Sequence, residues 1–392
     1  MRLKKAVSAA LAAAMSLTLL AGCGSGGQQN SQGSSSGGET FKIGGIGPVT
    51  GSAAVYGEAV KNGAELAVKE INEAGGINGV QIEFNYQDDE NDAEKAVNAY
   101  NTLKDWGMQM LLGTVTSGPC VSVGEVAQAD NIFMLTPSGT AVDCVKYDNA
   151  FRVCFSDPMQ GLESAKYIGE NNLATKVAAI YDSSDVYSTG IYNAFAEEAE
   201  NQNFEIVAAE AFTGESKSDF SVQIQKAKDA GAELVFLPFY YSEASLVLKQ
   251  AAGMNYSPIF FGCDGMDGIL AVEGFDASLA NDLIFLSPFT PTSEDEAIQK
   301  FVKDYESAYG GTPNQFAADA YDGVYAIKAA LEKAEATSDM SPSDLCEAMK
   351  TAMTEVTIDG VTAKGLTWEA SGEPSKAPMV VKIADGDYAV VE

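Results

Sequence analysis

The feature that most constrains the fold is a regular alternation between short apolar segments and amphipathic helical segments, which begins at residue 41. In the first pair, an apolar run at 41–47 precedes a stretch at 60–71 whose apolar residues recur at helical spacing, and Gly75 and Gly76 end it. An alternating strand is predicted at residues 80–86, and apolar strands are predicted at residues 108–113, 132–135, 176–181, 205–208, 233–238 and 259–262. Strands that are apolar throughout and separated by helices indicate parallel sheets covered on both faces, so the predicted class is doubly wound α/β.

The segments between these strands carry helix signals. Helices are predicted at residues 93–103, from 119, at 160–171, from 189, at 219–230 and at 242–252. Farther along, Ser293 and Glu296 match a capping box for a helix that reaches Tyr309, and Ser341 with Pro342 starts the last helix. About 350 residues follow position 40, and the number of predicted strands is larger than one sheet holds comfortably. Two lobes are therefore predicted.

The N-terminus predicts export. Three basic residues within the first five positions precede an apolar run at 6–20, which is too short to span a bilayer comfortably. The run ends in LAGC, which resembles the lipobox of bacterial lipoproteins and places the acylated cysteine at Cys23. An ordinary secretory signal with a chance cysteine is the alternative. We therefore predict a lipoprotein signal peptide at 1–22, and a flexible tether rich in glycine and serine at 23–40.

The strong negative charge argues against a nucleic-acid partner. The formal charge is −31, and removal of the signal peptide with its three basic residues brings it to −34. The acidic residues are spread along the chain, which indicates solubility rather than a cation site. The acidic run at 88–92 lacks the glycine and the terminal glutamate of an EF-hand loop, so no metal site is predicted.

The absence of histidine from the chain removes several enzyme classes. It excludes Ser-His-Asp and Cys-His nucleophilic systems and the HExxH metal site. The sequence has no GxSxG motif, and its glycine-rich stretch at 44–48 fits neither the dinucleotide fingerprint nor the P-loop. We expect no catalytic residues and no cofactor.

Six cysteines are present, and their pairing stays open. If Cys23 carries lipid, the remaining five cannot all pair with one another. Cys144 and Cys154 are close enough in sequence for a local disulfide in an extracellular protein, and no metal-ligand spacing is present. The five are Cys120, Cys144, Cys154, Cys263 and Cys346.

Several segments together resemble the leucine/isoleucine/valine-binding proteins of branched-chain amino-acid ABC importers, over essentially residues 41–392. The most specific are GPVTG at 47–51, YG at 56–57, NGAELA at 62–67, GGING at 75–79, DD at 88–89, TPSGT at 136–140, AYD at 320–322 and GLTW at 365–368. The resemblance implies a type I periplasmic-binding-protein fold, in which two doubly wound parallel-sheet lobes are joined by three crossing segments.

By position, we expect the crossings near 155–158, 286–289 and 378–381. The first lobe then comprises 41–156 and 289–378, and the second comprises 157–288 and 379–392.

Polar residues follow two predicted first-lobe strands. Ser117 lies between a strand that ends at Gly113 and a helix that begins near Pro119, where free N–H groups and a hydroxyl suit a ligand carboxylate. The resemblance places a serine there too, and it implies that Ser138 and Thr140 grip the ammonium and carboxylate of an amino acid. The alternative is that these residues merely cap helices.

In the second lobe, Asp264 follows the strand at 259–262 and is the predicted counter-charge for a buried ammonium. Many relatives have a glutamate there, and a surface-loop aspartate is the alternative. The resemblance further implies that Tyr187 and Tyr240 close over the ligand and that Tyr56 and Phe316 line its side-chain pocket. All four are alternatively core aromatics. Relatives with a disulfide near the first site loop have cysteine in place of Thr116, so that bridge is absent here.

We expect a monomeric, lipid-anchored solute-binding protein on the extracellular face of the cell membrane. It would capture a small amino acid, branched-chain or otherwise aliphatic, for the permease and ATPase of an ABC importer. A ligand sensor with the same fold, and a ligand such as a small amide, urea or an aromatic acid, are the alternatives.

Overall fold

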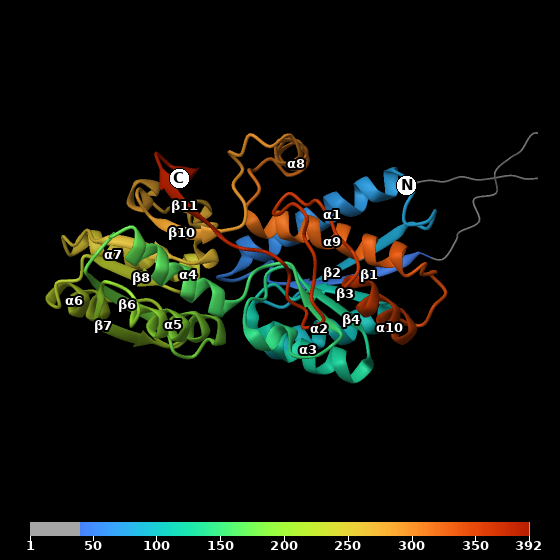
Figure 1. The fold of residues 1–392 in the computed structure, drawn as a ribbon, viewed down its shortest axis with the longest axis horizontal. Helices are drawn as coiled ribbons and strands as arrows, with labels where there is room; N and C mark the ends of the chain where they lie inside the picture. The colour runs from blue at the N-terminus through green and yellow to red at the C-terminus, as the bar shows by residue number, and fades with distance from the viewer. Residues whose placement is uncertain (1–39, 392) are drawn as a thin grey trace, which may run out of the picture. The chain divides into compact units, whose positions relative to one another are not determined.

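Two separate β-sheets organise the computed structural model, which describes residues 40–391 (Figure 1). The predicted signal peptide, the predicted lipidation site Cys23 and all of the predicted tether except its last residue lie outside the described residues. Residues Glu39–Glu392 form one unit, so contacts between the two sheets and their helices belong to a single body. No helix within the described part of the chain is both long and apolar enough to cross a membrane.

The first sheet is entirely parallel and has the order β2-β1-β3-β4-β5. Ile43 on β1 pairs with Phe84 on β2 at one side and with Met110 on β3 at the other. Its strands are β1 (Phe41–Gly47), β2 (Ile82–Asp88), β3 (Met110–Gly113), β4 (Phe133–Thr136) and β5 (Ala150–Arg152). β3, β4 and β5 are buried along their whole length, which explains why their sequences lack alternation.

The second sheet has the order β12-β11-β10-β9-β8-β6-β7. It is parallel from β7 to β10 and ends in an antiparallel hairpin of β11 and β12. Its strands are β6 (Lys176–Asp182), β7 (Glu205–Phe212), β8 (Leu234–Leu237), β9 (Ile259–Gly262), β10 (Ile284–Ser287), β11 (Met379–Ala384) and β12 (Asp387–Val390). The chain therefore returns to this sheet after the helices that precede β11.

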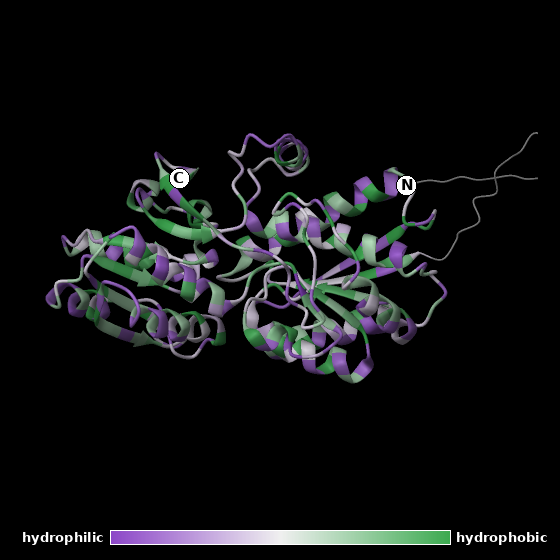
Figure 2. Cartoon of the chain, in the orientation of Figure 1, coloured by the Kyte–Doolittle hydropathy of each residue, from purple (hydrophilic) through white to green (hydrophobic). Residues whose placement is uncertain are grey.

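Helices cover both sheets with their apolar sides, and Figure 2 shows hydrophobic strands flanked by helices of mixed hydropathy. They are α1 (Ala54–Glu73), α2 (Ala93–Trp106), α3 (Ser117–Asp130), α4 (Asp157–Glu170), α5 (Val186–Ala199), α6 (Ser221–Asp229), α7 (Tyr241–Gly253), α8 (Glu296–Tyr309), α9 (Gln315–Lys333) and α10 (Pro342–Met353). We call the first sheet with α1, α2, α3, α9 and α10 the first lobe, and the second sheet with α4 to α7 the second lobe. The exact lobe boundaries stay a prediction.

The packing of α1 on α9 shows how the sequence pattern becomes structure. The predicted apolar stripe at 60–71 is buried at Val60, Ala64 and Ile71. Gly63 lies on the same face, and a Cβ there would collide with the carbonyl of Ala317. The glycine therefore allows the two helix backbones to approach closely.

Several sequence predictions are corrected by the structure. The capping box at Ser293 is wrong, because the N-cap of α8 is Asp295, which accepts hydrogen bonds from the N–H groups of Ala297 and Ile298. Ser293 instead accepts a hydrogen bond from the N–H of Asp295 and shapes the preceding turn. Helix α5 begins at Val186 rather than at 189, since Asp185 caps it. Helix α9 and strands β5 and β10 to β12 were not predicted from the sequence.

Candidate ligand-binding site

A small cavity lies where the carboxyl ends of strands from both lobes meet the N-termini of helices. Its lining residues are Tyr56, Val115, Thr116, Ser117, Ser138, Tyr187, Tyr240, Asp264, Gly265 and Phe316. The structure thus brings together every predicted ligand residue except Thr140, which lies directly behind Ser117. The cavity volume is about 10 Å³, which is room for one water-sized group. An amino acid enters only when its walls move apart.

The first-lobe end of the cavity is built on the N-terminus of α3. Ser117 is the first residue of that helix, and its Oγ accepts a hydrogen bond of 3.2 Å from the N–H of Ala141. The Oγ1 of Thr140 lies 3.4 Å from the same oxygen. Two hydroxyls therefore meet at a helix end that favours negative charge.

Ser138 contributes to the site differently from its neighbours. Its Oγ donates a hydrogen bond of 2.7 Å to the carbonyl of Val115. The hydroxyl therefore joins the loop after β4 to the loop after β3. Gly139, the next residue, donates its N–H to the Oγ1 of Thr136 at 2.8 Å. The part of Ser138 left to face a ligand is its backbone.

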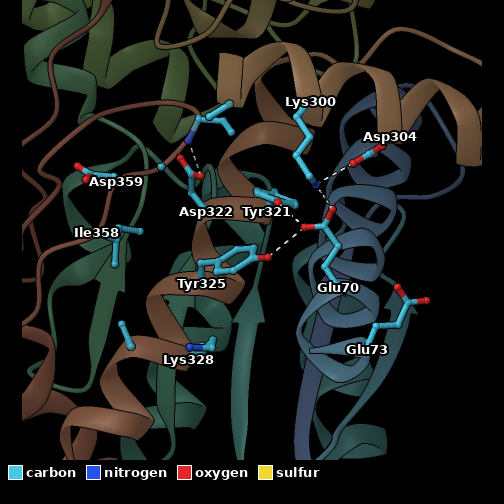
Figure 3. A pocket seen from close by; sticks show the side chains of 14 residues that line it. Glu70, Glu73, Lys300, Asp304, Tyr321, Asp322, Tyr325, Lys328, Ile358 and Asp359 are labelled. Carbon is cyan, nitrogen blue, oxygen red and sulfur yellow. Dashed lines mark hydrogen bonds and ion pairs between the residues drawn. The ribbon is translucent and has the colours of Figure 1, made fainter. Parts of the chain in front are cut away.

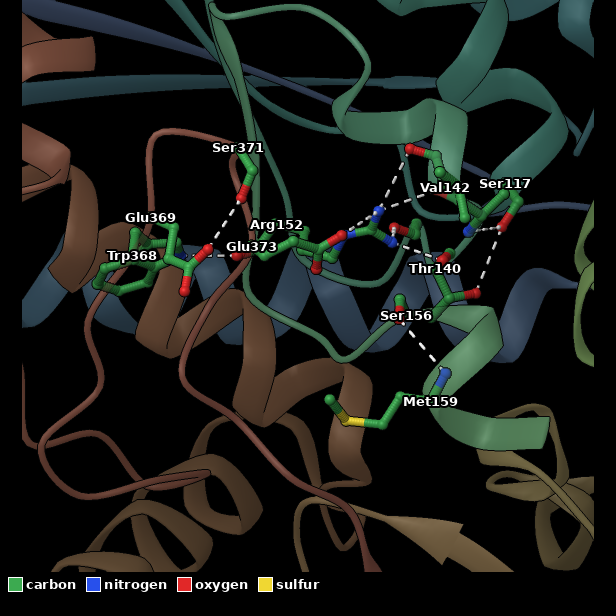
Figure 4. Close-up of polar contacts among 12 residues, drawn as sticks. Ser117, Thr140, Val142, Arg152, Ser156, Met159, Trp368, Glu369, Ser371 and Glu373 are labelled. Atoms are coloured by element: carbon green, nitrogen blue, oxygen red, sulfur yellow. Dashed lines mark hydrogen bonds and ion pairs between the residues drawn. The ribbon is translucent and has the colours of Figure 1, made fainter. Parts of the chain in front are cut away.

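Arg152 holds the 138–142 loop from behind and was missed by the sequence analysis (Figure 4). The fully buried guanidinium donates to the carbonyls of Gly139, Thr140 and Ala141, and it forms an ion pair of 3.1 Å with Glu373. Burial lowers the pKa of Arg152, but nearby thiols and carboxylates outweigh it and keep the pKa raised. Its one sequence signal is a cation inside the apolar segment 150–154.

The same arginine ties the loop to the chain before β11. Trp368 donates its Nε1–H to the carbonyl of Arg152 at 2.7 Å, and Arg152 donates its own N–H to the carbonyl of Gly372 at 3.0 Å. The segment at 368–373 therefore braces β5 and the loop that carries Thr140.

Asp264 supplies the negative end of the site. It follows β9 and is buried, and the Tyr187 hydroxyl donates to its Oδ1 at 2.7 Å. Its own N–H donates to Gln160 Oε1 at 3.0 Å. Burial raises the pKa of Asp264 to about 7, although the Tyr187 and Gln160 side chains oppose the shift. This carboxyl is poised to ionise when a cation arrives.

Two more second-lobe carboxyls belong to the same surroundings, and of these Asp157 is buried while Asp185 is partly exposed. Asp157 begins α4, and neither of its carboxylate oxygens has a hydrogen-bond partner. Asp185 caps α5 beside Tyr187, and burial raises its pKa to about 6. Burial also raises the pKa of Asp157, so the second-lobe side of the cavity concentrates groups that gain from a positive ligand.

Aromatic rings close the remaining walls. The Tyr56 and Phe316 rings lie 4.2 Å apart between centroids, and Tyr187 stacks on Tyr240 at 4.9 Å. The Tyr56 hydroxyl donates to the carbonyl of Gly265 at 2.5 Å, so its polar end is occupied and its ring borders the cavity. These walls suit an aliphatic group.

A larger hollow of about 870 Å³ lies between α1, α8, α9 and the segment at 358–361 (Figure 3). At its centre Glu70 accepts hydrogen bonds from Tyr321 at 2.5 Å, Tyr325 at 3.0 Å and Lys300 at 2.7 Å. These groups are already paired with one another, and the hollow is away from the strand ends where ligands bind in such sheets. Within residues 40–391, no three acidic, cysteine or histidine side chains are grouped as metal ligands.

Comparisons with known proteins point to one family. Residues 40–387 match the family described as periplasmic binding protein. The Leu/Ile/Val-binding protein homolog 3 of Brucella melitensis is 32% identical over 76% of this chain and 80% of its own length. The leucine-, isoleucine-, valine-, threonine-, and alanine-binding protein of Pseudomonas aeruginosa is 31% identical over 80% of this chain and 82% of its own.

A solved structure agrees with these relatives. The branched-chain amino acid transporter substrate binding protein LivJ from Streptococcus pneumoniae, in complex with isoleucine, superposes with a TM-score of 0.81 at 30% identity. The match covers 90% of this chain and 99% of that one.

Proposed function

This chain belongs to the periplasmic binding protein family, and from that premise we propose that it captures a small aliphatic amino acid between its lobes for a branched-chain amino-acid ABC importer. The observation that carries the proposal is that one cavity has a group suited to an anion on one side and a group suited to a cation on the other. Ser117 and Thr140 stand at a helix N-terminus suited to a carboxylate, and Asp264 stands across from them as the partner of an ammonium.

The remaining walls support an aliphatic side chain over a charged one. The Tyr56 hydroxyl is occupied by Gly265, and Val115 and Phe316 add apolar surface. A charged side chain would lack a free partner there and would carry the full cost of desolvation. The names of the relatives, which include leucine, isoleucine, valine, threonine and alanine, support the same ligand class.

Capture follows from closure of the lobes rather than from covalent chemistry. A ligand that contacts Ser117 in the first lobe and Asp264 in the second binds the closed arrangement better than an open one, and it shifts the population accordingly. No step of this process needs a catalytic group.

We place the mature protein on the extracellular face of the membrane as a monomer held by lipid on Cys23. The support is the LAGC sequence after a basic and apolar leader, followed by a glycine- and serine-rich segment. Delivery of the ligand to a permease and ATPase follows from the family.

A thermal-shift screen of the purified protein against amino acids, small amides, urea and aromatic acids tests the proposal. We expect the melting temperature to rise with leucine, isoleucine or valine. Asp264→Asn should weaken the affinity for the best ligand by about 100-fold, because the ammonium loses its counter-charge.

Asp105→Asn, at an exposed position far along α2, is the matched control and should bind as the wild type does. A shift with amides, urea or aromatic acids alone would overturn the amino-acid assignment. Equal binding by Asp264→Asn and the wild type would refute the site.

A further inference from the structure

Two buried cysteines face each other directly behind the first-lobe half of the site. Cys120 lies one turn into α3, and Cys144 lies in the short helix η1 (Val142–Val145). A Cβ built on Gly139 would lie 2.8 Å from the Cys120 sulfur and 3.1 Å from the Cys144 sulfur. Both sulfurs therefore lie beside the same backbone position, and each thiol is close enough to shift the pKa of the other.

The pair connects the two loops that carry the proposed ligand groups. Cys120 follows Ser117 on the same helix, and Cys144 follows Thr140 in the next loop. The Cys144 sulfur also lies 3.8 Å from the carbonyl of Ser117. A covalent bond between the sulfurs would join the base of α3 to the loop that Arg152 holds.

The surroundings give the two sulfurs different roles. Burial raises the pKa of Cys120, but the nearby Cys144 thiol, the Thr136 hydroxyl and the charge of Arg152 outweigh it and bring the pKa below its ordinary value. Burial raises the pKa of Cys144, and Cys120 adds to the shift. Cys120 is thus the sulfur that deprotonates more readily, and Cys144, whose thiol lies against the carbonyl of Ser117, is its partner.

We propose that Cys120 and Cys144 form a redox-active dithiol that a small peroxide converts to a disulfide beneath the ligand site. The Cys120 thiolate attacks hydrogen peroxide, its O–O bond breaks, and a sulfenic acid and hydroxide form. The Cys144 sulfur then attacks the Cys120 sulfur, and the sulfenic oxygen leaves as water. Two thiols lose two electrons and two protons, and one peroxide becomes two waters.

Two of the other cysteines, Cys263 and Cys346, lie elsewhere in the fold. All five cysteines in residues 40–391 are free and buried, so the Cys144–Cys154 bridge considered from sequence is not formed. Cys263 contacts the Ser164 hydroxyl at 3.9 Å, and Cys346 lies in α10. The thiol partner of Cys144 is Cys120.

The test is peroxide titration of the full chain carrying Cys23→Ser, followed by thiol alkylation under denaturing conditions and peptide mass spectrometry. We expect two of the five remaining thiols to be lost, with one cross-linked species two hydrogen atoms lighter that joins the Cys120 and Cys144 peptides. Dithiothreitol should reverse the change, and the oxidised protein should melt a few degrees higher.

Cys144→Ser should abolish the cross-link, whereas Cys346→Ser, the control, should retain it. If a serine variant folds poorly, cross-link mapping in the chain that carries only Cys23→Ser still shows whether Cys120 and Cys144 are joined. Five reactive thiols after peroxide, or a cross-link between any other pair, would overturn the proposal. Neither outcome depends on which solute the protein binds.

Discussion

Ionisation of the buried Asp264 carboxyl lowers the stability of the folded state, and a bound ammonium removes that loss. It is buried, and its pKa of about 7 shows that burial disfavours its charge more than the Tyr187 hydroxyl stabilises it. In an unfolded chain its pKa would be about 4. Because the folded state binds the proton more tightly, this group contributes less stability as the pH rises from about 4 to about 7. A bound ammonium reverses that penalty.

Ligand affinity should therefore depend on pH. A bound ammonium lowers the pKa of Asp264 from about 7, so binding below that pH must release a proton. We expect affinity for a neutral aliphatic amino acid to be constant above pH 7 and to weaken by up to about tenfold per unit below it. Calorimetric titration between pH 5 and pH 8 measures this.

Asp264→Asn should flatten most of the profile, with residual slope from Asp157 and Asp185, whose pKa values are also raised. A wild-type affinity that does not change between pH 5 and pH 8 would contradict the role given to this carboxyl.

Residues that directly follow an apolar strand could be predicted from sequence, and residues that act through another loop could not. Ser117 and Asp264 follow β3 and β9, so the position of each strand end located them. Arg152 acts by donating to carbonyls of Gly139 and Thr140, and no local pattern encodes that contact. The ligand role of each side chain stays a prediction.

At the scale of elements, helices with one apolar face and one polar face could be predicted from the sequence. Elements that are buried on several faces, or that are very short, could not. α1 and α2 have a polar face that makes their period visible. α9 is buried around much of its circumference, and its buried positions include the polar residues Gln315, Asp319 and Asp322, which interrupt the apolar pattern. β5 has three residues and the β11–β12 hairpin is partly exposed, so neither reads as a buried strand.

A matched pair of glycine-to-alanine substitutions tests whether the close contact between α1 and α9 requires Gly63. Gly63→Ala would place a methyl group against the Ala317 carbonyl and force the helices apart. We expect the free energy of unfolding to fall by about 1–3 kcal/mol in urea denaturation. Ligand affinity should fall as well, because Tyr56 and Phe316 lie on these two helices.

The control is Gly124→Ala in α3, where a Cβ meets nothing within 4 Å. It should raise the free energy of unfolding by up to about 1 kcal/mol, because alanine favours helix more than glycine does. Equal effects of the two substitutions would show that close approach does not explain Gly63.

At the scale of the whole molecule, direct contacts between the lobes help to set how often the site is closed. Gln315 begins α9 in the first lobe, and its N–H donates to Asp267 Oδ2 of the second lobe at 2.8 Å. Val55 donates its N–H to the Tyr241 hydroxyl at 3.3 Å. Asp267 and Tyr241 are outside the lining of the cavity, so they act on closure rather than on the ligand.

Asp267→Ala should therefore weaken binding of every ligand by the same factor, about tenfold, because the closed population falls while the cavity is unchanged. Titrations with leucine, valine and alanine check this. Asp282→Ala, at a highly exposed second-lobe position, should change nothing. A change in the ratio of affinities would place Asp267 in the pocket instead.

The most direct test of the central claim is calorimetric titration with isoleucine and with two analogues that each lack one of its charged groups. 3-Methylpentanoic acid lacks the ammonium, and 2-methylbutylamine lacks the carboxylate. We predict that isoleucine binds and that each analogue binds about 1000-fold more weakly or not at all, because Asp264 or the Ser117 helix end loses its partner. Binding of either analogue as tightly as isoleucine would contradict capture by opposed charges at this cavity.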